Sequence, residues 1–207
     1  MADASNVRGD RCVDAVTPQR DVPAVTAVVL AAGTSSRMGT QKLLLPVRGV
    51  PMVDRVLAAC AGIETVVVAS PRLVEHLRTS CATVVINTDP HLGMAHSLAL
   101  AHAHIARDRA IAVFLADKPL MTAALARRVI DAGQTAHADV CFPERGGVGG
   151  HPVYFSPRAR ERICGLKGDS LRSLRDAPNL RRILIPIADE GAYFDVDDPG
   201  ALLALDE

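Results

Sequence analysis

Short apolar runs rich in β-branched residues, separated by longer segments with helical spacing, constrain the fold of this chain more than any other feature. Such runs occupy residues 26–31, 65–70, 82–87 and 110–117. Helical spacing follows them or precedes them at residues 51–60, 71–80, 95–106 and 122–135. A short, continuously apolar run is typical of a strand that is covered on both faces. The alternation therefore predicts an α/β fold, Rossmann-like and three-layered (α/β/α), with a mostly parallel sheet.

The two ends of the chain have a different character. Residues 1–24 lack apolar periodicity, and we expect them to form a flexible tail ahead of one domain that spans residues 25–207. After a Gly-rich stretch at 146–150, the last third contains the strand-like HPVYF, two short helical pieces, a strand near 182–187 and the acidic FDVDDP. We expect this part to cap one side of the sheet.

The charge balance and composition exclude several function classes. Lys plus Arg and Asp plus Glu number 23 each, so the chain has no positive surplus with which to hold nucleic acid or an anionic membrane. No apolar run approaches the roughly 18 to 20 residues that cross a bilayer. The polar N-terminus lacks an apolar signal segment, and the five cysteines are scattered. We expect a cytoplasmic protein with reduced thiols, no zinc site and a small-molecule ligand.

The loop after the first apolar run has the features of a phosphate-binding loop. Gly33 and Gly39 can adopt positive φ and let backbone amides approach a ligand, while Arg37 and Lys42 add positive charge. A simple surface turn is the alternative. Five residues separate the two glycines, whereas a P-loop has four. The spacing GxGxxG is also missing, which disfavours a dinucleotide-binding oxidoreductase.

Acidic residues follow at two further points. Asp117 ends the run at 110–117, and the carboxyl edge of a parallel sheet is where ligands bind. Asp195 and Asp197 are two apart, so in an extended segment both carboxylates project to the same side and can face one cation. Each of these aspartates is also suited to cap a helix. Lys118, next to Asp117, is expected to be exposed.

The first loop closely resembles the LAAGxSxRMGxxKxLLP signature of nucleotidyltransferases with a molybdopterin-guanylyltransferase-like domain. The matching positions are Leu30, Ala31, Ala32, Gly33, Ser35, Arg37, Met38, Gly39, Lys42, Leu44, Leu45 and Pro46. The resemblance implies a nucleotidyltransferase fold in which Arg37 and Lys42 contact the triphosphate of a nucleotide. It implies that Asp117 holds Mg²⁺, and that the DVDDP element brings Asp195 and Asp197 toward the metal. The nucleotide-binding residues that it implies are Leu30, Ala31, Ala32, Gly33, Gly39, Asn87, Gly93 and Ser97.

Two later elements resemble the part of the family that contacts the second substrate. GHPVYF and GDSLR make Gly150, His151, Gly168 and Asp169 the candidate acceptor-binding residues, although a hairpin entry explains the glycines equally well. These elements and LAAG are most similar to the members that use CTP. They imply transfer of CMP from CTP to the terminal phosphate of the molybdopterin (molybdenum) cofactor, with a recipient molybdoenzyme as a further partner. The alternatives are a guanylyltransferase, a sugar-1-phosphate nucleotidyltransferase and a non-catalytic pterin-binding insertion chaperone.

Overall fold

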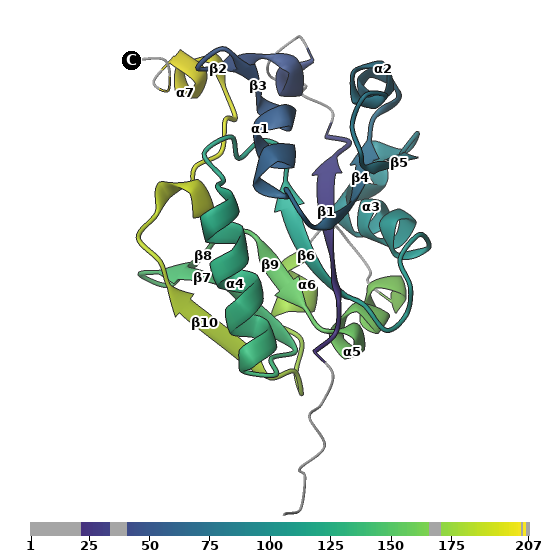
Figure 1. Ribbon diagram of the computed structural model, residues 1–207, viewed down its shortest axis with the longest axis vertical. Coiled ribbons are helices and arrows are strands. Elements are labelled where there is room, and N and C mark those ends of the chain that lie inside the picture. The colour runs from purple at the N-terminus through teal and green to yellow at the C-terminus, as the bar shows by residue number, and fades with distance from the viewer. Residues whose placement is uncertain (1–21, 34–40, 166–170, 204, 206–207) are drawn as a thin grey trace, which may run out of the picture.

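Strand β1 (Val25–Ala31) lies at the centre of the sheet in a computed structural model that describes residues 22–33, 41–165, 171–203 and 205. It pairs in parallel with β4 (Glu64–Ala69) on one side and with β6 (Ala110–Leu115) on the other. Strand β5 (Thr83–Ile86) extends the parallel pairing beyond β4. The four predicted strands therefore lie side by side and end at one edge of the sheet (Figure 1).

The last third of the chain completes the sheet on the far side of β6. Strand β9 (Val153–Phe155) is antiparallel to both β6 and β7 (Val140–Arg145), and β10 (Arg182–Pro186) pairs in parallel with β7. The order is β10-β7-β9-β6-β1-β4-β5, with the short β8 (Val148–Gly149) paired to β7. The prediction of an α/β fold with a mostly parallel sheet is confirmed.

Some elements were not predicted from the sequence. Strand β7 contains Pro143 and ends in two charged residues, so it lacks the continuous apolar run that marks the other strands. A separate two-stranded ribbon of β2 (Pro46–Val47) and β3 (Val50–Pro51) follows the first loop. The helix expected at residues 71–80 is shorter, because a 3₁₀ turn at Pro71–Leu73 leads into α2 (Val74–Leu77), which ends three residues early.

Helices cover both faces of the sheet. On one face lie α1 (Met52–Ala59), α2 and α4 (Ala123–Thr135), and on the other lie α3 (Gly93–His102), α5 (Pro157–Arg160) and α6 (Leu171–Arg175). The remaining short elements are 3₁₀ turns at Lys42–Leu44, Pro90–Leu92, Glu161–Gly165 and Glu190–Ala192, and helix α7 (Pro199–Leu203). This is the expected three-layer arrangement.

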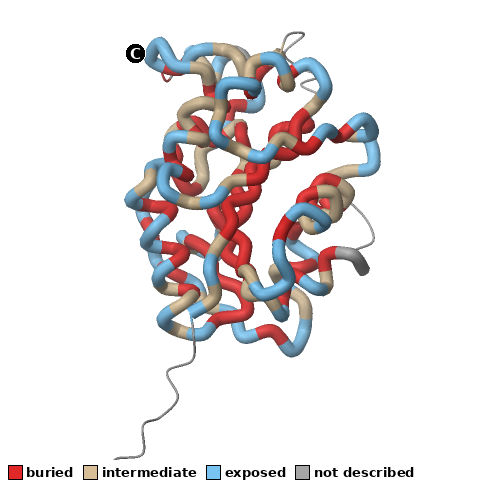
Figure 2. Tube along the Cα trace, turned by 45° about the vertical axis from the view of Figure 1, so that its right-hand side comes forward, coloured by how far each residue is buried: buried red, intermediate tan, exposed pale blue. Residues whose placement is uncertain are grey.

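The strands are buried because alternate side chains enter two different cores. In β1, Val29 packs in the core beneath α1 and α4, while Val28 packs in the core beneath α3, and both are fully buried. The same alternation in β6 places Phe114 in the first core and Val113 in the second. Figure 2 shows the buried stretch through the centre of the molecule. Burial on both faces explains why these strands have no polar side.

The residues at the start of the described chain are attached to the sheet. The carbonyl of Pro23 accepts a hydrogen bond from Nε2 of Gln134 at 2.8 Å, and that of Ala24 accepts one from the amide of Ala110 at 2.9 Å. Residues 1–21 of the expected tail lie outside the described residues.

Among the described residues, no helix is both long and apolar enough to cross a bilayer. Cys60, Cys81 and Cys141 are free thiols.

Thr122 caps α4, since its side chain accepts a hydrogen bond from the amide of Leu125 at 3.2 Å. We expect Thr122→Ala to lower the free energy of unfolding by about 1 kcal/mol, because one amide in the first turn of α4 loses its acceptor. Urea denaturation measures the change. Thr122→Ser keeps the oxygen and is the control. Equal stability of the two variants would show that the cap contributes nothing.

Candidate functional site

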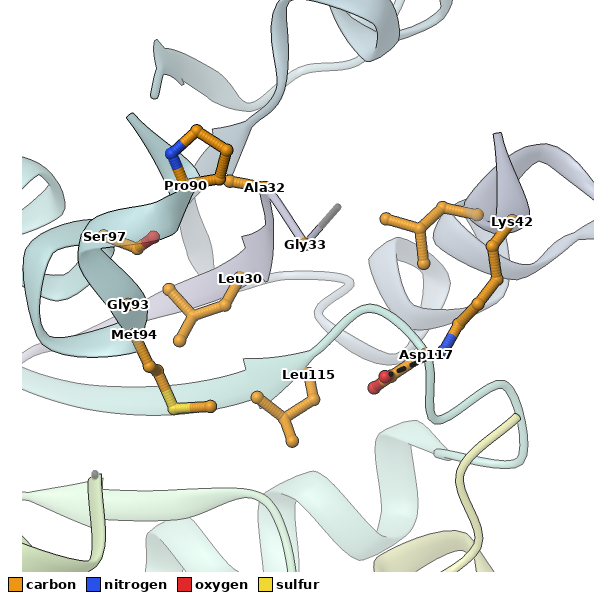
Figure 3. Close-up of a pocket in the computed structure, with 11 residues that line it drawn as sticks. Leu30, Ala32, Gly33, Lys42, Pro90, Gly93, Met94, Ser97, Leu115 and Asp117 are labelled. Atoms are coloured by element: carbon orange, nitrogen blue, oxygen red, sulfur yellow. Dashed lines mark hydrogen bonds and ion pairs between the residues drawn. The ribbon is translucent and has the colours of Figure 1, made fainter. Parts of the chain in front are cut away.

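A cavity of about 250 Å³ opens where β1 and β6 end. Its lining residues are Leu30, Ala32, Gly33, Lys42, Leu43, Pro90, Gly93, Met94, Ser97, Leu115 and Asp117. Leu30 and Leu115 are register partners on the paired strands and form an apolar floor, with α3 along one side (Figure 3). Because the loops after these strands begin at the cavity, its position is the one predicted for a ligand site in this fold.

Lys42 connects two carboxylates at one end of this cavity. Its Nζ lies 3.2 Å from Oδ2 of Asp117 and 3.4 Å from Oδ1 of Asp197. The Lys42 side chain is only 10% exposed, whereas those of Asp117 and Asp197 are 30% and 58% exposed. The ammonium is thus shared by carboxylates from two different segments, and Figure 3 shows the Lys42–Asp117 pair at the cavity wall.

The local structure explains how Lys42 and Asp117 reach this position. Lys42 begins the 3₁₀ turn that follows the first loop. Strand β6 ends at Leu115, two residues earlier than expected, so Asp117 lies in the turn after the strand and not at its last position. The amide of Ala116 still donates to the carbonyl of Leu30 at 3.1 Å, which keeps this turn beside β1.

Asp195 and Asp197 contact different lysines. Asp197 pairs with Lys42, while Oδ2 of Asp195 lies 3.8 Å from Nζ of Lys118. The segment between Tyr193 and Asp198 is not a strand, so the alternation assumed for an extended segment does not apply. Among the described residues, no three His, Cys, Asp or Glu side chains are grouped closely enough to hold a metal ion.

The expectation that Lys118 is exposed was wrong. Its side chain is 7% exposed, and Nζ donates a hydrogen bond to the carbonyl of Tyr193 at 2.7 Å. Burial lowers the pKa of Lys118, and the charge of Asp195 opposes this effect. The chain folds back over this lysine from Tyr193 onward, which a position next to Pro119 in the sequence does not reveal.

Asn87 does not line the cavity but supports a residue that does. It is fully buried, and its Nδ2 donates to Oγ of Ser97 at 2.9 Å while its Oδ1 accepts from the amide of Asp89 at 2.8 Å. These bonds fix the connection between β5 and α3. Gly93 begins α3 with φ +84°, a conformation that favours glycine, so the backbone at the cavity wall has no side chain.

A second cavity, of about 270 Å³, adjoins the first. It is lined by Met94, Gly149, Gly150, His151, Val153, Leu171, Arg172 and Arg175. Met94 lines both cavities, so they share a wall. Arg175 packs its guanidinium over the ring of Phe142 at 4.7 Å, and a side chain at Gly150 would meet the carbonyl of Ala192 at 2.8 Å. The two candidate acceptor residues that the structure describes, Gly150 and His151, both lie here.

His151 is a neutral group in this cationic cavity. Burial, followed by the charges of Lys118 and Arg175, lowers the pKa of His151 to about 3. Its Nδ1 is buried and has no hydrogen-bond partner within the described part of the chain. Near neutral pH the imidazole therefore contributes hydrogen bonding and not charge.

The structure brings a large part of the predicted site together. Lys42, Asp117, Gly33, Gly93 and Ser97 line the first cavity, and Asp197 joins them through Lys42. Ala31 is buried in the core beneath α1 and α4. Arg37, Gly39, Gly168 and Asp169 lie outside the described residues.

Several lining residues were not predicted from the sequence. Pro90, Leu115 and Arg175 were not assigned to the site. The pairing of Leu115 with Leu30 could have been inferred from the parallel strands. No pattern in the sequence singles out Arg175.

Comparison with known proteins gives the family. Residues 27–184 match the model of the MobA-like NTP transferase domain. The chain belongs to the MobA-like NTP transferase family. It is 29% identical over 181 residues to a molybdenum cofactor guanylyltransferase of Xanthomonas euvesicatoria, covering 84% of this chain and 90% of that protein. The chain is therefore a nucleotidyltransferase by family.

Solved structures agree with this assignment. The crystal structure of Rv0371c from Mycobacterium tuberculosis H37Rv has a TM-score of 0.75 at 26% identity, covering 89% of this chain and 98% of that chain. A structure of the same protein in complex with manganese has a TM-score of 0.71 at 25% identity, covering 88% and 97% of the two chains. The chain thus shares its fold with these structures over almost their whole length.

The buried imidazole of His151 makes stability depend on pH. Between pH about 6.5 and 3 the unfolded chain binds a proton at this residue and the folded chain does not, so the free energy of unfolding falls as the pH falls. We expect the loss between pH 7 and pH 5 to be smaller in His151→Gln than in the wild type, by about 2 kcal/mol.

Urea denaturation of both proteins at the two pH values measures this difference. His104→Gln, which replaces an exposed histidine, is the matched control. The same pH dependence in His151→Gln and wild type would contradict the burial of a neutral imidazole.

Proposed function

We propose that this nucleotidyltransferase moves CMP from CTP to the terminal phosphate of a molybdopterin-type (molybdenum) cofactor, with Mg²⁺, and releases pyrophosphate. The observation that carries the proposal is the ammonium of Lys42 held between Asp117 and Asp197 at the wall of a cavity. A positive charge and two carboxylates in one place suit a triphosphate bound together with a divalent cation. A recipient molybdoenzyme would then bind the product.

The two carboxylates have the chemistry of a magnesium site. Asp117 and Asp197 each direct an oxygen at the same nitrogen of Lys42, so both already face one centre of positive charge. Mg²⁺ is usually held by one or two carboxylates, with phosphate oxygens and water as its other ligands. A third acidic side chain is therefore unnecessary. The manganese complex of the mycobacterial relative supports a divalent cation in this fold.

The first cavity suits a nucleotide. Leu30, Leu115 and Met94 offer apolar contact for a base or sugar, and the hydroxyl of Ser97 lies on the same wall. Gly33 exposes backbone where the strand ends, and Lys42 supplies charge for phosphate oxygens. The LAAG sequence at residues 30–33 favours CTP, whereas the name of the Xanthomonas relative favours GTP.

In the proposed reaction an oxygen of the acceptor's terminal phosphate attacks the α-phosphorus of CTP. A new bond forms between this oxygen and the α-phosphorus. The bond between the α-phosphorus and the oxygen that bridges to the β-phosphate breaks, and pyrophosphate leaves with the electron pair. The attacking phosphate is already anionic near neutral pH, so no side chain has to remove a proton. Lys42 neutralises charge on the phosphates, and Asp117 and Asp197 would hold the cation. When bound, Mg²⁺ lowers the charge repulsion at the α-phosphate.

The second cavity supports a two-substrate reaction. It shares Met94 with the nucleotide cavity and presents Arg172 and Arg175, whose charges suit an anionic acceptor. His151 adds a neutral imidazole to the same wall. An acceptor bound here lies next to the nucleotide, as transfer between the two requires.

The purified protein, incubated with molybdopterin cofactor, Mg²⁺ and either CTP or GTP, tests the proposal. We expect pyrophosphate release that requires the cofactor and Mg²⁺ and is faster with CTP. Faster release with GTP would identify a guanylyltransferase. Release with a sugar 1-phosphate in place of the cofactor would identify a sugar nucleotidyltransferase. Cofactor binding without pyrophosphate release would identify a non-catalytic carrier.

Lys42→Ala and Asp117→Asn should each lower kcat/KM by at least about 100-fold, because the first removes the positive charge that neutralises the phosphates and the second removes a carboxylate that would hold the cation. The side chains lie at the edge of the sheet and not in either core, so the variants should unfold cooperatively like the wild type. Asp131→Asn makes the same change at an exposed aspartate of α4 and is the control for Asp117→Asn. Wild-type rates in either cavity variant would contradict the assigned roles.

A further inference from the structure

Lys118 lies beside the proposed metal site but lines neither cavity. Its side chain is 7% exposed, and its Nζ donates to the carbonyl of Tyr193 at 2.7 Å and lies 3.8 Å from Oδ2 of Asp195. A buried ammonium is unfavourable unless it is paired and hydrogen-bonded. The partners of Lys118 come from the carboxyl-terminal segment 193–197, which also carries Asp197.

We propose that Lys118 is a positioning residue, which fixes segment 193–197 to the end of β6 and thereby places Asp197 opposite Asp117. This inference rests on the proposed function, in which Asp117 and Asp197 hold the divalent cation. Lys118 would touch neither the nucleotide nor the cation. Its effect would pass through the backbone of the segment.

A second hydrogen bond supports this attachment. The amide of Val196 donates to the carbonyl of Asp117 at 3.0 Å. The side chain of Val196 is fully buried and packs with Val47, Met52 and Leu205. Lys118 and Asp117 therefore bind the segment at two consecutive points of the turn after β6, one through a side chain and one through the backbone.

The Asp197 side chain cannot hold this position by itself. It is 58% exposed, and its contact with Lys42 spans 3.4 Å, so surface packing restrains it little. Its position then depends on the backbone at Val196 and Tyr193. Because Lys118 holds the carbonyl of Tyr193, loss of this lysine removes the side-chain bond that ties the amino-terminal side of the segment to the turn after β6.

A purely electrostatic role of Lys118 predicts the opposite change in cation affinity. If Lys118 acted only as a positive charge close to Asp195, its removal would strengthen the binding of a divalent cation by the nearby carboxylates. If Lys118 positions the segment, its removal weakens that binding. The affinity for the cation therefore separates the two roles without reference to turnover.

The experiment compares wild type, Lys118→Met and Lys118→Arg. Free Mn²⁺ is titrated by electron paramagnetic resonance, and hydrogen exchange is followed in peptides that cover residues 190–198. In Lys118→Met we expect Mn²⁺ affinity to fall about tenfold, as for loss of one hydrogen bond from a charged group, and exchange at the Val196 amide to rise. Exchange in β4 and β5 should not change. Lys118→Arg keeps charge and donors and should restore both measurements.

Each other outcome is informative. Wild-type Mn²⁺ affinity and wild-type exchange in Lys118→Met would overturn the positioning role, and tighter Mn²⁺ binding would assign Lys118 an electrostatic one. Failure of the wild type to bind Mn²⁺ would contradict the proposed metal chemistry, and exchange alone would then decide whether Lys118 fixes the segment. If Lys118→Met does not fold, Lys118→Gln, which keeps a polar group there, is measured in the same way.

Discussion

The parallel pairing of β1 between β4 and β6 ends three strands at one edge of the sheet, and the site depends on that edge. Residues that follow these strands lie close together at this edge because the strands are adjacent and parallel. Gly33 follows β1, and Asp117 follows β6. Pairing is secured by burial on both faces, because α1 and α4 pack on one side and α3 on the other. The same hydrophobic burial that stabilises the sheet thus determines where the polar groups gather.

The carboxyl-terminal segment completes the site from a distant part of the sequence. Asp197 is 155 residues from Lys42 along the chain, yet the two side chains form an ion pair. The segment is held through backbone and apolar contacts, including the fully buried Val196. Charges that are partly exposed gain little from pairing alone, so this packing accounts for the geometry better than the ion pair does.

The fold was predictable because its signals are local. Runs of β-branched residues identified β1, β4, β5 and β6, and the helical spacing at residues 122–135 identified α4. Strand β7 was not predicted, since Pro143 interrupts its apolar character and its place in the sheet is set by pairing with β9 and β10. The resemblance of the first loop added the chemistry of Lys42, which spacing alone left open.

The sequence alone indicated that Gly33 and Asp117 follow parallel strands and that Lys42 lies near them, because strand periodicity and loop chemistry are properties of neighbouring residues. Only the tertiary structure decided that Asp197 meets Lys42, that Asp195 meets Lys118, and that Lys118 is buried. The reason is that a side chain's partners and its burial depend on which distant segment packs over it. No sequence pattern around Lys118 predicts that the backbone at Tyr193 packs against this lysine.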